Sequence, residues 1–577
     1  MRGFYEAIGA EGIPKKMRGF FIALALVVLL GAVVYGAQEA AASEGEAFDK
    51  FPSIHISVDN PRLPFTRELW RNVTVTITGA EGLIPETTGV PALMRGRGNT
   101  SWTSSPDKPP FRLRFDEQPQ QMPFSSVAAR DWTFLNQHSD FTLMRDFIAF
   151  HLSHQMSGMT VSPFASFIHV YVDGEYMGLY LNSIQVSDPV PCGDEGRRTS
   201  LVRHNNPARS EFLLERCYRG LYDPELRMGQ DLLWVGGVLY RIRFGRTEPA
   251  HNEYVRDFMT QVHNAIVAQD PDLFEMVNFQ SFVDWYVVHE LFRDHDAGRT
   301  SSFMQLRLDE DGRRYLELGP VWDFDHAAAG SNWQLPAHPY HVWVPNGNPY
   351  DGGRYAHSWF ASLMEMPQFY DAVVERFGAL QEYYLPNAFA YVSDLVARYE
   401  ACFQRNFQRH PVFGRAVMDM SRELIGLNNF EEHLHFLFSW LSIRTDWLMG
   451  YFTGDSPYFT VEALRFADAV ASPGDTVRLI HLNVQSTATQ TTQAELRGYA
   501  IYHNGSRVRE GRFDAPDSGE IIFDIPRAAM LNAGTYTVNI LYTKQWQATV
   551  LMPEDAYAPT RRINTRLRYG SAQLIVR

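Results

Sequence analysis

The hydrophobic periodicity of the chain changes along its length, and this change limits the possible folds more than any other feature. Apolar and polar side chains alternate over residues 48–90, as in IHISV at 54–58, which predicts β-strands. From about residue 250 to about residue 450 the apolar spacing becomes helical, with one strand pair at 301–319. The sequence therefore predicts a β-rich half followed by a helical half.

Two shorter patterns add detail to the β-rich half. The segment KPPFRLRFDE at 108–117 alternates, so Arg112 and Arg114 share one face of a predicted strand and the apolar side chains share the other. The segment 167–184 predicts a hairpin, because the Asp-Gly pair at 173–174 is a strong turn signal between two apolar runs.

Two further elements are predicted between and after these strands. The spacing over 140–158 predicts a helix, with Asp140 as its N-cap and Gly158 as its stop. The segment EFLLER at 211–216 predicts one more strand.

The last part of the chain has the cadence of a β-sandwich. Alternating segments are separated by turn signals at roughly ten-residue spacing, which places a domain boundary near residue 455. The predicted fold class is α+β. It comprises a lead segment over 1–47, a domain over 48–455 in which the β-rich half precedes the helical half, and an all-β sandwich-like domain over 456–577.

The N-terminus carries a long apolar run. Residues 20–37, FFIALALVVLLGAVVYGA, are uncharged and follow Lys15, Lys16 and Arg18. Eighteen helical residues at 1.5 Å each just cross a bilayer core of about 30 Å, and preceding positive charge keeps that end cytoplasmic. The length favours an uncleaved membrane anchor over a cleaved signal peptide, and a buried core helix is the remaining alternative. The bulk of the chain is thus expected to be extracytoplasmic or secreted.

The net charge and the cysteine content argue against several classes of protein. A formal net charge of −14 argues against general nucleic-acid binding, which needs a positive footprint. Three cysteines, Cys192, Cys217 and Cys402, make neither a disulfide scaffold nor a zinc-ligand spacing. Cys192 and Cys217 could pair outside the cytosol, and buried thiols are the alternative.

Four aspartates lie in two short Asp-x-Asp segments: Asp294, Asp296, Asp323 and Asp325. Phosphoryl transfer to a hydroxyl needs a carboxylate that accepts or orients the proton, and acidic oxygens that hold magnesium at the nucleotide phosphates. A lone aspartate here would more simply cap a helix or turn. Two such pairs, one beside Trp322, favour the catalytic interpretation.

The segment HELFR at 289–293 is not a zinc-protease helix, because Arg293 occupies the position of the second histidine. His289, His295 and His326 could bind a transition metal, and helix-face or pocket histidines are the simpler interpretation.

The stretch LMRGRGNTSW at 93–102 alternates two arginines with two glycines. Alone it is either a tight turn or a weak phosphate-loop signal. It precedes the strand with Lys108, Arg112 and Arg114, and such a basic loop and strand can bring backbone N–H groups and guanidinium groups to a phosphate.

Seven segments resemble the CotH spore-coat protein kinase family in fixed order. They are RGRGNTSW, KPPFRLRFD, TLMRD, VYVDGEYMGLY, FLLE, the first Asp-x-Asp and GPVWDFDHAAAG, across about residues 50–450. The family pattern runs roughly RGRGNSSW, KKPYRLKFD, SLMRN, VYLNGEYLGLY, YLLE, NxD and GPVWDFD. The resemblance implies a kinase-like two-lobed fold and transfer of phosphate from ATP, with Mg²⁺, to Ser or Thr of secreted or spore-surface proteins.

The resemblance also implies roles for single residues. Asp296 matches the catalytic aspartate, and Asp323 and Asp325 match the metal-binding WDFD, with Asp294 as a further metal candidate. The remaining matches imply nucleotide contacts at Gly96, Arg97, Gly98, Lys108, Arg112, Arg114, Arg145 and Glu215.

Three positions depart from the family pattern. Asp294 replaces the Asn of NxD, Arg114 replaces the Lys of RLKF, and Ser301 stands where a downstream Asn is a candidate second metal ligand. The expected function is an exported or membrane-tethered atypical Ser/Thr protein kinase with a protein acceptor. The alternative is a catalytically degenerate scaffold that binds a surface partner through its C-terminal β-domain.

Overall fold

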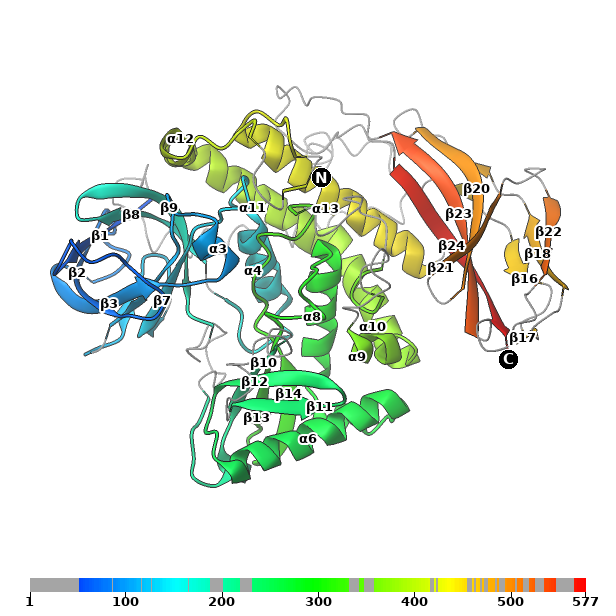
Figure 1. Cartoon of the computed structure of the whole chain (residues 1–577), viewed down its shortest axis with the longest axis horizontal. Helices are drawn as coiled ribbons and strands as arrows, with labels where there is room; N and C mark the ends of the chain where they lie inside the picture. Colours follow the sequence, from blue (N-terminus) through cyan, green and yellow to red (C-terminus); the bar gives the residue numbers. More distant parts are fainter. Residues whose placement is uncertain are drawn as a thin grey trace, which may run out of the picture.

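The structure is a computed structural model of the whole chain (Figure 1). It describes residues 51–453 except for 86, 116, 126, 164, 187–200, 218–230, 332–341, 347–356, 416–419 and 422–423, together with the strands between 459 and 576. The predicted anchor at 20–37 and Cys192 lie outside the described residues. Within the described part of the chain, no helix combines the length and apolarity that a bilayer span requires.

A seven-stranded closed barrel forms the first lobe, in the order β1-β2-β3-β4-β7-β9-β8. Every neighbouring pair is antiparallel except β1 and β8. Alternating apolar side chains, among them Ile54, Val75 and Leu113, fill its interior. The strands are β1 (Ser53–Val58), β2 (Arg71–Thr78), β3 (Val90–Gly96), β4 (Phe111–Arg114), β7 (Asp131–Leu135), β8 (Ser166–Val172) and β9 (Glu175–Ile184).

The structure confirms the hairpin predicted over 167–184. Strands β8 and β9 pair across a two-residue turn in which Asp173 has φ 49° and Gly174 has φ 84°. Two positive φ angles define the turn type that suits the twist of a hairpin, which is why Asp-Gly was the informative signal.

The helix predicted over 140–158 is shorter than expected. It is α4 (Arg145–Met156), and Met144 is its N-cap. Asp140 instead anchors the approach to the helix, since its carboxylate accepts hydrogen bonds from the backbone N–H groups of Thr142 and Arg145. At the other end Ser157, with φ 58°, takes the left-handed position, and Gly158 is needed because a Cβ there would lie 2.3 Å from an Asp284 oxygen.

The second lobe combines a sheet with helices, so it is less purely helical than its periodicity suggested. Its antiparallel sheet has the order β11-β12-β10-β13-β14. The strands are β10 (Phe212–Arg216), β11 (Leu232–Val235), β12 (Val238–Phe244), β13 (Phe303–Leu308) and β14 (Arg314–Leu318). Strands β10, β13 and β14 confirm expectations from sequence, whereas β11 and β12 were not foreseen.

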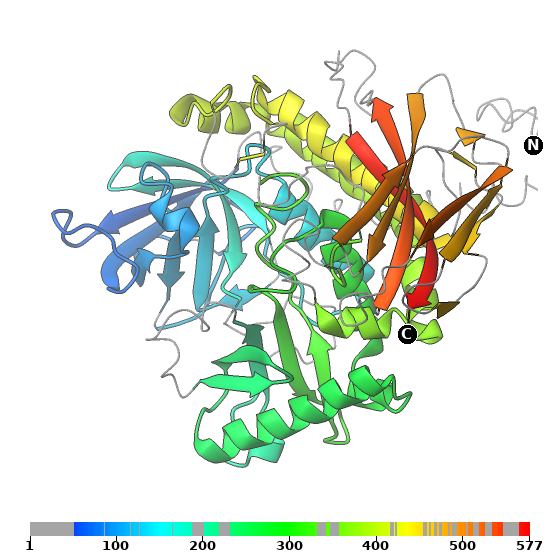
Figure 2. The same cartoon turned by 45° about the vertical axis from the view of Figure 1, so that its right-hand side comes forward.

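Helices surround this sheet and fill the rest of the lobe. In both views α6 (Pro249–Ala268) runs along the sheet (Figures 1 and 2). The others are α7 (Leu273–Met276), α8 (Phe279–Phe292), α9 (Ser358–Leu363), α10 (Pro367–Ala379), α11 (Leu385–Arg398), α12 (Glu400–Arg409) and α13 (Phe430–Thr453). Helix α8 is the central one, because its residues from Ser281 to Phe292 are all buried.

The C-terminal strands form a two-stranded sheet, β15-β19, a three-stranded sheet, β16-β18-β22, and a five-stranded sheet, β17-β24-β23-β20-β21. Their bounds are β15 (Phe459–Thr460), β16 (Ala463–Phe466), β17 (Val470–Ala471), β18 (Thr476–Leu482), β19 (Gln485–Ser486), β20 (Gln493–His503), β21 (Ser506–Gly511), β22 (Ser518–Asp524), β23 (Gly534–Gln545) and β24 (Thr565–Val576). This agrees with the alternating pattern of the sequence. Face-to-face packing as a sandwich, and the domain boundary near 455, stay predictions.

A buried ion pair ties α13 to α8. The guanidinium of Arg444 contacts the carboxylate of Glu290 and donates 2.9 Å from Nη2 to the carbonyl of Glu290, and both side chains are fully buried. The same carboxylate accepts the backbone N–H groups of Trp343 at 2.6 Å and Val344 at 2.7 Å. Burial raises the pKa of Glu290 and lowers that of Arg444, so each charge depends on the other.

Arg444→Met is expected to destabilise the chain by about 3–5 kcal/mol, because it leaves the Glu290 carboxylate buried without its cation. Denaturant unfolding measures the change. The matched control is Arg313→Met, whose side chain is 78% exposed on the β13–β14 hairpin, and it should unfold like the wild type. Equal midpoints for Arg444→Met and the control would contradict the assignment.

Candidate active site

The C-terminus of α8 positions the first Asp-x-Asp segment. Arg293 ends the helix with φ 51°, which turns the chain back over its last turn. Asp294 is 2% exposed, accepts 2.7 Å from His289 Nδ1 and 3.0 Å from the backbone N–H of Asp296. With these contacts Asp294 holds Asp296 in place, and its buried oxygens are poorly placed for a metal.

Asp296 lies beside the other carboxylates. Its pKa is raised to about 8, first by burial and then by the negative charges of Asp294 and Asp323. Its carbonyl accepts the N–H groups of Arg299 and Thr300, which form a single tight turn around it. A carboxylate with a raised pKa and a fixed backbone is suited to proton transfer.

The second Asp-x-Asp segment follows β14. Asp323 has φ 73° and is exposed, and Ser301 Oγ donates a 2.7 Å hydrogen bond to its Oδ2. The pKa of Asp325 is raised well above its usual value, by burial and by Asp323 and other carboxylates. Ser301, the position that departs from the family pattern, therefore does lie against a candidate metal ligand.

Asp146 is a fifth aspartate at this cluster, and sequence reasoning missed it. It is 3% exposed in α4, and its carboxylate accepts 2.6 Å from the N–H of Phe324 and 2.7 Å from Gln137 Nε2. Burial and the charge of Asp325 raise its pKa strongly. The TLMRD segment at 142–146 ends in Asp146, so the sequence contained this aspartate next to Arg145, the residue of that segment for which a role was predicted.

Arg97 brings positive charge from the barrel to this acidic cluster. The charges of Asp323, Asp146 and Asp325 all act to raise its pKa, although burial lowers it overall. Its guanidinium lies 5.9 Å from the ring centre of Trp322, the residue before Asp323. Of the predicted nucleotide contacts, Arg97 is thus the one placed opposite the carboxylates.

Two glycines give the RGRG loop its shape. At Gly96 a Cβ would lie 2.3 Å from the ring of Trp102, and at Gly98, with φ 80°, it would lie 2.2 Å from Ser101 Oγ. The loop continues into the short helix α3 (Thr100–Thr103), which folds back so that Trp102 packs on Gly96. The glycines on either side of Arg97 therefore serve close packing in the loop.

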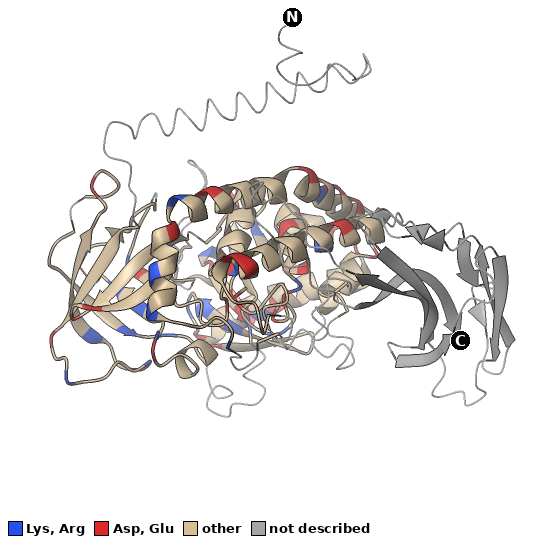
Figure 3. Cartoon of the chain, turned by 90° about the horizontal axis from the view of Figure 1, so that it is seen from above, with Lys and Arg blue, Asp and Glu red and all other residues tan. Residues whose placement is uncertain are grey.

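Arg112 and Arg114 lie on the outer face of β4, as the alternation predicted. Both bind Asp131, at 2.7 Å from Arg112 Nε and 3.1 Å from Arg114 Nε. Together with Arg95 they surround the ring of Trp70, at 4.6–5.6 Å. Figure 3 shows basic residues, in blue, on the strands of this lobe. The negative charges that act on Arg95 are those of Asp131 and Glu68, so three arginines face two carboxylates and this face keeps a positive excess suited to phosphate.

Arg145 is fully buried, and this placement disagrees with a direct nucleotide contact. It pairs with Asp140 and donates from Nε to Ala327 O at 2.9 Å and from Nη2 to Ala328 O at 3.3 Å. Because its side chain is buried, Arg145 is not placed to contact a nucleotide. Its hydrogen bonds instead position the loop that carries Asp325.

Lys108 is also separated from the carboxylates. It is 6% exposed, donates 3.0 Å to Asn406 Oδ1 and lies 5.1 Å from the ring centre of Tyr180. The expectation that it contacts the same phosphate as Arg97 finds no support in these contacts.

Glu215 lies on β10 at the edge of the cluster. It forms a 2.8 Å ion pair with Arg243, and the N–H of Ser301 donates to its carboxylate. Its pKa is raised, mainly by burial and less by Asp323, so it lies within electrostatic range of the candidate metal loop.

The donor set fits magnesium bound together with phosphate. In the described part of the chain, no three His, Cys, Asp or Glu side chains are close enough to hold a metal ion by themselves. Magnesium is normally held by one or two carboxylates plus substrate phosphates. Asp323 and Asp325 could supply that pair, and a cation between them would relieve the repulsion that raises the pKa of Asp325.

Comparison with known proteins gives a family. The CotH kinase protein family matches residues 94–448, which is more than half of the chain. The matched range includes all the predicted site residues, from Gly96 to Asp325. The chain belongs to the CotH kinase family. No curated protein matches this CotH-family chain.

The matches among solved structures include the Pseudomonas fluorescens alkylpurine DNA glycosylase AlkC bound to DNA containing an abasic site analog. The identity is 14% and the TM-score is 0.14, and the match covers 38% of this chain and 54% of that chain. The CotH-family chain therefore spans about half the length of the glycosylase, and a TM-score this low carries no argument about fold or function.

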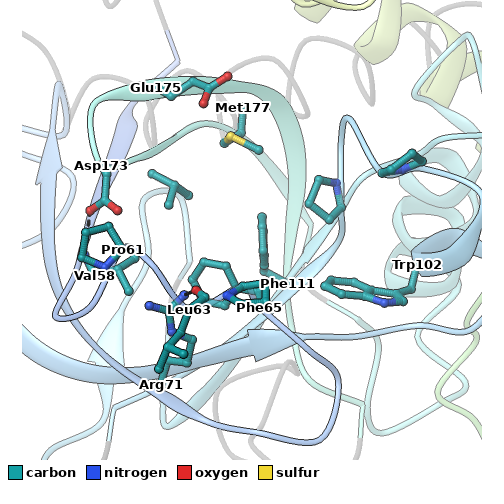
Figure 4. A pocket seen from close by; sticks show the side chains of 14 residues that line it. Val58, Pro61, Leu63, Phe65, Arg71, Trp102, Phe111, Asp173, Glu175 and Met177 are labelled. Carbon is teal, nitrogen blue, oxygen red and sulfur yellow. Dashed lines mark hydrogen bonds between the residues drawn. The ribbon is translucent and has the colours of Figure 1, made fainter.

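A separate apolar hollow of about 550 Å³ lies on the barrel lobe (Figure 4). Leu63, Phe65, Trp102 and Met177 are among its lining residues. Its one basic side chain, Arg71, donates to the carbonyls of Asn60 and Leu63. This hollow lacks the groups that a nucleotide needs, so it is not the candidate active site.

Gly96→Ala is expected to cost about 1–3 kcal/mol, because the new Cβ would force Trp102 off the loop. Thermal unfolding measures the loss. Gly378→Ala is the control, since its Cβ would meet nothing nearer than 4.0 Å in helix α10, and there alanine should stabilise by up to about 1 kcal/mol. If the Gly96 variant proves as stable as the wild type, the packing of Trp102 on Gly96 is wrong.

Proposed function

We propose that this CotH-family chain is a magnesium-dependent protein kinase that transfers the γ-phosphate of ATP to Ser or Thr of surface or secreted proteins. The observation that carries the proposal is the grouping of Asp296, Asp323 and Asp325 opposite Arg97. The apolar run at 20–37 supports an exported or membrane-anchored location.

The roles follow from the contacts of each group. Asp296 would accept the proton of the acceptor hydroxyl, and Asp294 would hold it through the Asp296 N–H. Arg97 would contact the phosphates from the barrel side. Magnesium, when bound, would supply charge neutralisation at the phosphate oxygens. Asp323 and Asp325 would hold it, with Ser301 orienting Asp323.

Asp296→Asn is expected to lower kcat at least about 100-fold, because the amide cannot accept the hydroxyl proton. The assay is transfer of label from ATP to a Ser-rich acceptor protein. Asp311→Asn is the control, an aspartate 80% exposed on the β13–β14 hairpin, and should retain full activity. A kcat unchanged in the Asp296 variant would remove Asp296 from the mechanism.

A nucleotide-free scaffold, acting as a surface adhesion protein through the C-terminal strands, is the second candidate. One observation favours it. In protein kinases a basic residue on a strand of the first lobe pairs with a glutamate, whereas here Arg114 binds Asp131 and Glu215 binds Arg243. Either this pairing rearranges when nucleotide binds, or the site is degenerate.

The melting temperature separates the two functions. A kinase should be stabilised by ATP with magnesium, by about 2.7 kcal/mol at a hundredfold excess over Kd, because ligand binds only the folded state. Arg97→Gln should shrink this shift, and Arg313→Gln on the distant hairpin should leave it intact. No shift in the wild-type chain would favour the scaffold.

A further inference from the structure

A small polar cavity lies apart from the apolar hollow on the barrel lobe. Its volume is about 190 Å³, and it is enclosed by three segments: the 104–108 stretch after α3, residues 136–143, and residues 406–415 at the end of α12. Nucleotide and drug-sized ligands occupy about 300–1,000 Å³, so this cavity suits a much smaller group.

The cavity lining contains buried polar atoms with unmet hydrogen bonds. Ser104 Oγ, Ser105 Oγ and Gln137 Oε1 have no hydrogen-bond partner in the described part of the chain. Ser105 is 2% exposed and Gln137 is 4% exposed. Because most buried polar atoms in folded proteins are satisfied, these atoms point to a ligand that offers acceptor oxygens to the serine hydroxyls and a protonated oxygen to Gln137 Oε1. The serine hydroxyls can both donate.

The same cavity holds a buried ammonium group. The only acceptor recorded for Lys108 Nζ in the described residues is the neutral amide of Asn406, at 3.0 Å, and no carboxylate forms an ion pair with it there. Burial lowers the pKa of Lys108 to about 7. A buried cation without an anion is costly, and an anionic ligand in the cavity would offset that cost.

The other charges around the cavity leave it basic. Arg409 and Arg415 line it together with Lys108, and the acids are Asp107 and Asp140. Arg409 is paired with Glu175 at 2.8 Å, and burial lowers the pKa of His410, also in the lining, to about 4, so that His410 is neutral. Asp140 is neutralised by its buried ion pair with Arg145, and Asp107 is exposed. His138, also in the lining, has its pKa lowered to about 4, first by burial, so it is neutral and can donate one hydrogen bond.

We propose that this cavity binds a phosphate-sized anion, either free inorganic phosphate or the phosphoryl group of a phosphoserine. Lys108 supplies the charge, and Ser104 and Ser105 donate from their hydroxyl groups. This assigns Lys108 to a second anion site rather than to the nucleotide. The site does not depend on the proposed kinase activity, because its residues differ from those of the acidic cluster.

The cavity is connected to the candidate active site by one side chain. Gln137 is one of its lining residues and donates from Nε2 to Asp146 at 2.7 Å. Asp146 in turn accepts the N–H of Phe324, which lies between Asp323 and Asp325. A protonated oxygen of hydrogen phosphate that donates to Gln137 Oε1 would therefore order Gln137 and, through Asp146, the loop with Asp323 and Asp325. Phosphorylated acceptors or phosphate itself could influence turnover by this route.

Calorimetric titration of the full chain with inorganic phosphate, without ATP, tests the site. The wild type should show saturable binding, and Lys108→Met should weaken it at least about tenfold, since it removes the charge-assisted hydrogen bond. Ser105→Ala should weaken it by a smaller factor and serves as the second variant if Lys108→Met does not fold. The control, Arg313→Gln, should bind as the wild type does.

A second arm identifies the source of the anion. A phosphoserine peptide that binds more tightly than inorganic phosphate, and loses that advantage in Lys108→Met, indicates a phosphorylated protein ligand. Equal affinity for both indicates the free anion. The proposal is overturned if the wild type shows no saturable phosphate binding, or if the Lys108 and Ser105 variants bind phosphate like the control. Loss of kinase activity would not affect either result.

Discussion

One buried guanidinium holds the arrangement of the candidate active site. Arg145 neutralises Asp140 and donates to the carbonyls of Ala327 and Ala328, which lie just after Asp323 and Asp325. Ala328 and Ala329 both have positive φ, a conformation that non-glycine residues adopt only when their surroundings impose it. The loop can keep this shape because Arg145 satisfies its carbonyls inside the protein.

Charge crowding is the second organising feature, and it has an energetic meaning. Asp146, Asp296 and Asp325 all have raised pKa values, with burial as the first cause and neighbouring carboxylates as a further one. A protein gains nothing in stability from such repulsion. Its presence beside Arg97 is understandable if the site binds a divalent cation and phosphates, which supply the missing charge. In that case the crowded acids obtain their opposite charge from a bound ligand, whereas the buried Glu290 obtains it from Arg444 within the protein.

The sequence predicted much of the local structure, because strand alternation and turn chemistry act over a few residues. The hairpin around Asp173 and the outward face of Arg112 and Arg114 were correct for this reason. Strands β11 and β12 were missed, because short strands beside turn residues carry little periodic signal. The N-cap role expected of Asp140 was wrong, since the helix begins only at Arg145 and Met144 is its N-cap. Asp140 acts from before the helix, where its carboxylate accepts the Arg145 N–H and pairs with the Arg145 guanidinium.

By itself, the sequence determined the membership in the CotH kinase family, the order of β-rich and helical parts, and the types of residue available for phosphate and metal. Tertiary structure alone decided which of them meet. Arg97 faces the carboxylates, whereas Arg145 and Lys108, equally basic in the sequence, are buried with other partners. The physical reason is that a motif records residue type and spacing. Burial and charge neighbours, which set what a side chain can bind, depend on segments far apart in the chain.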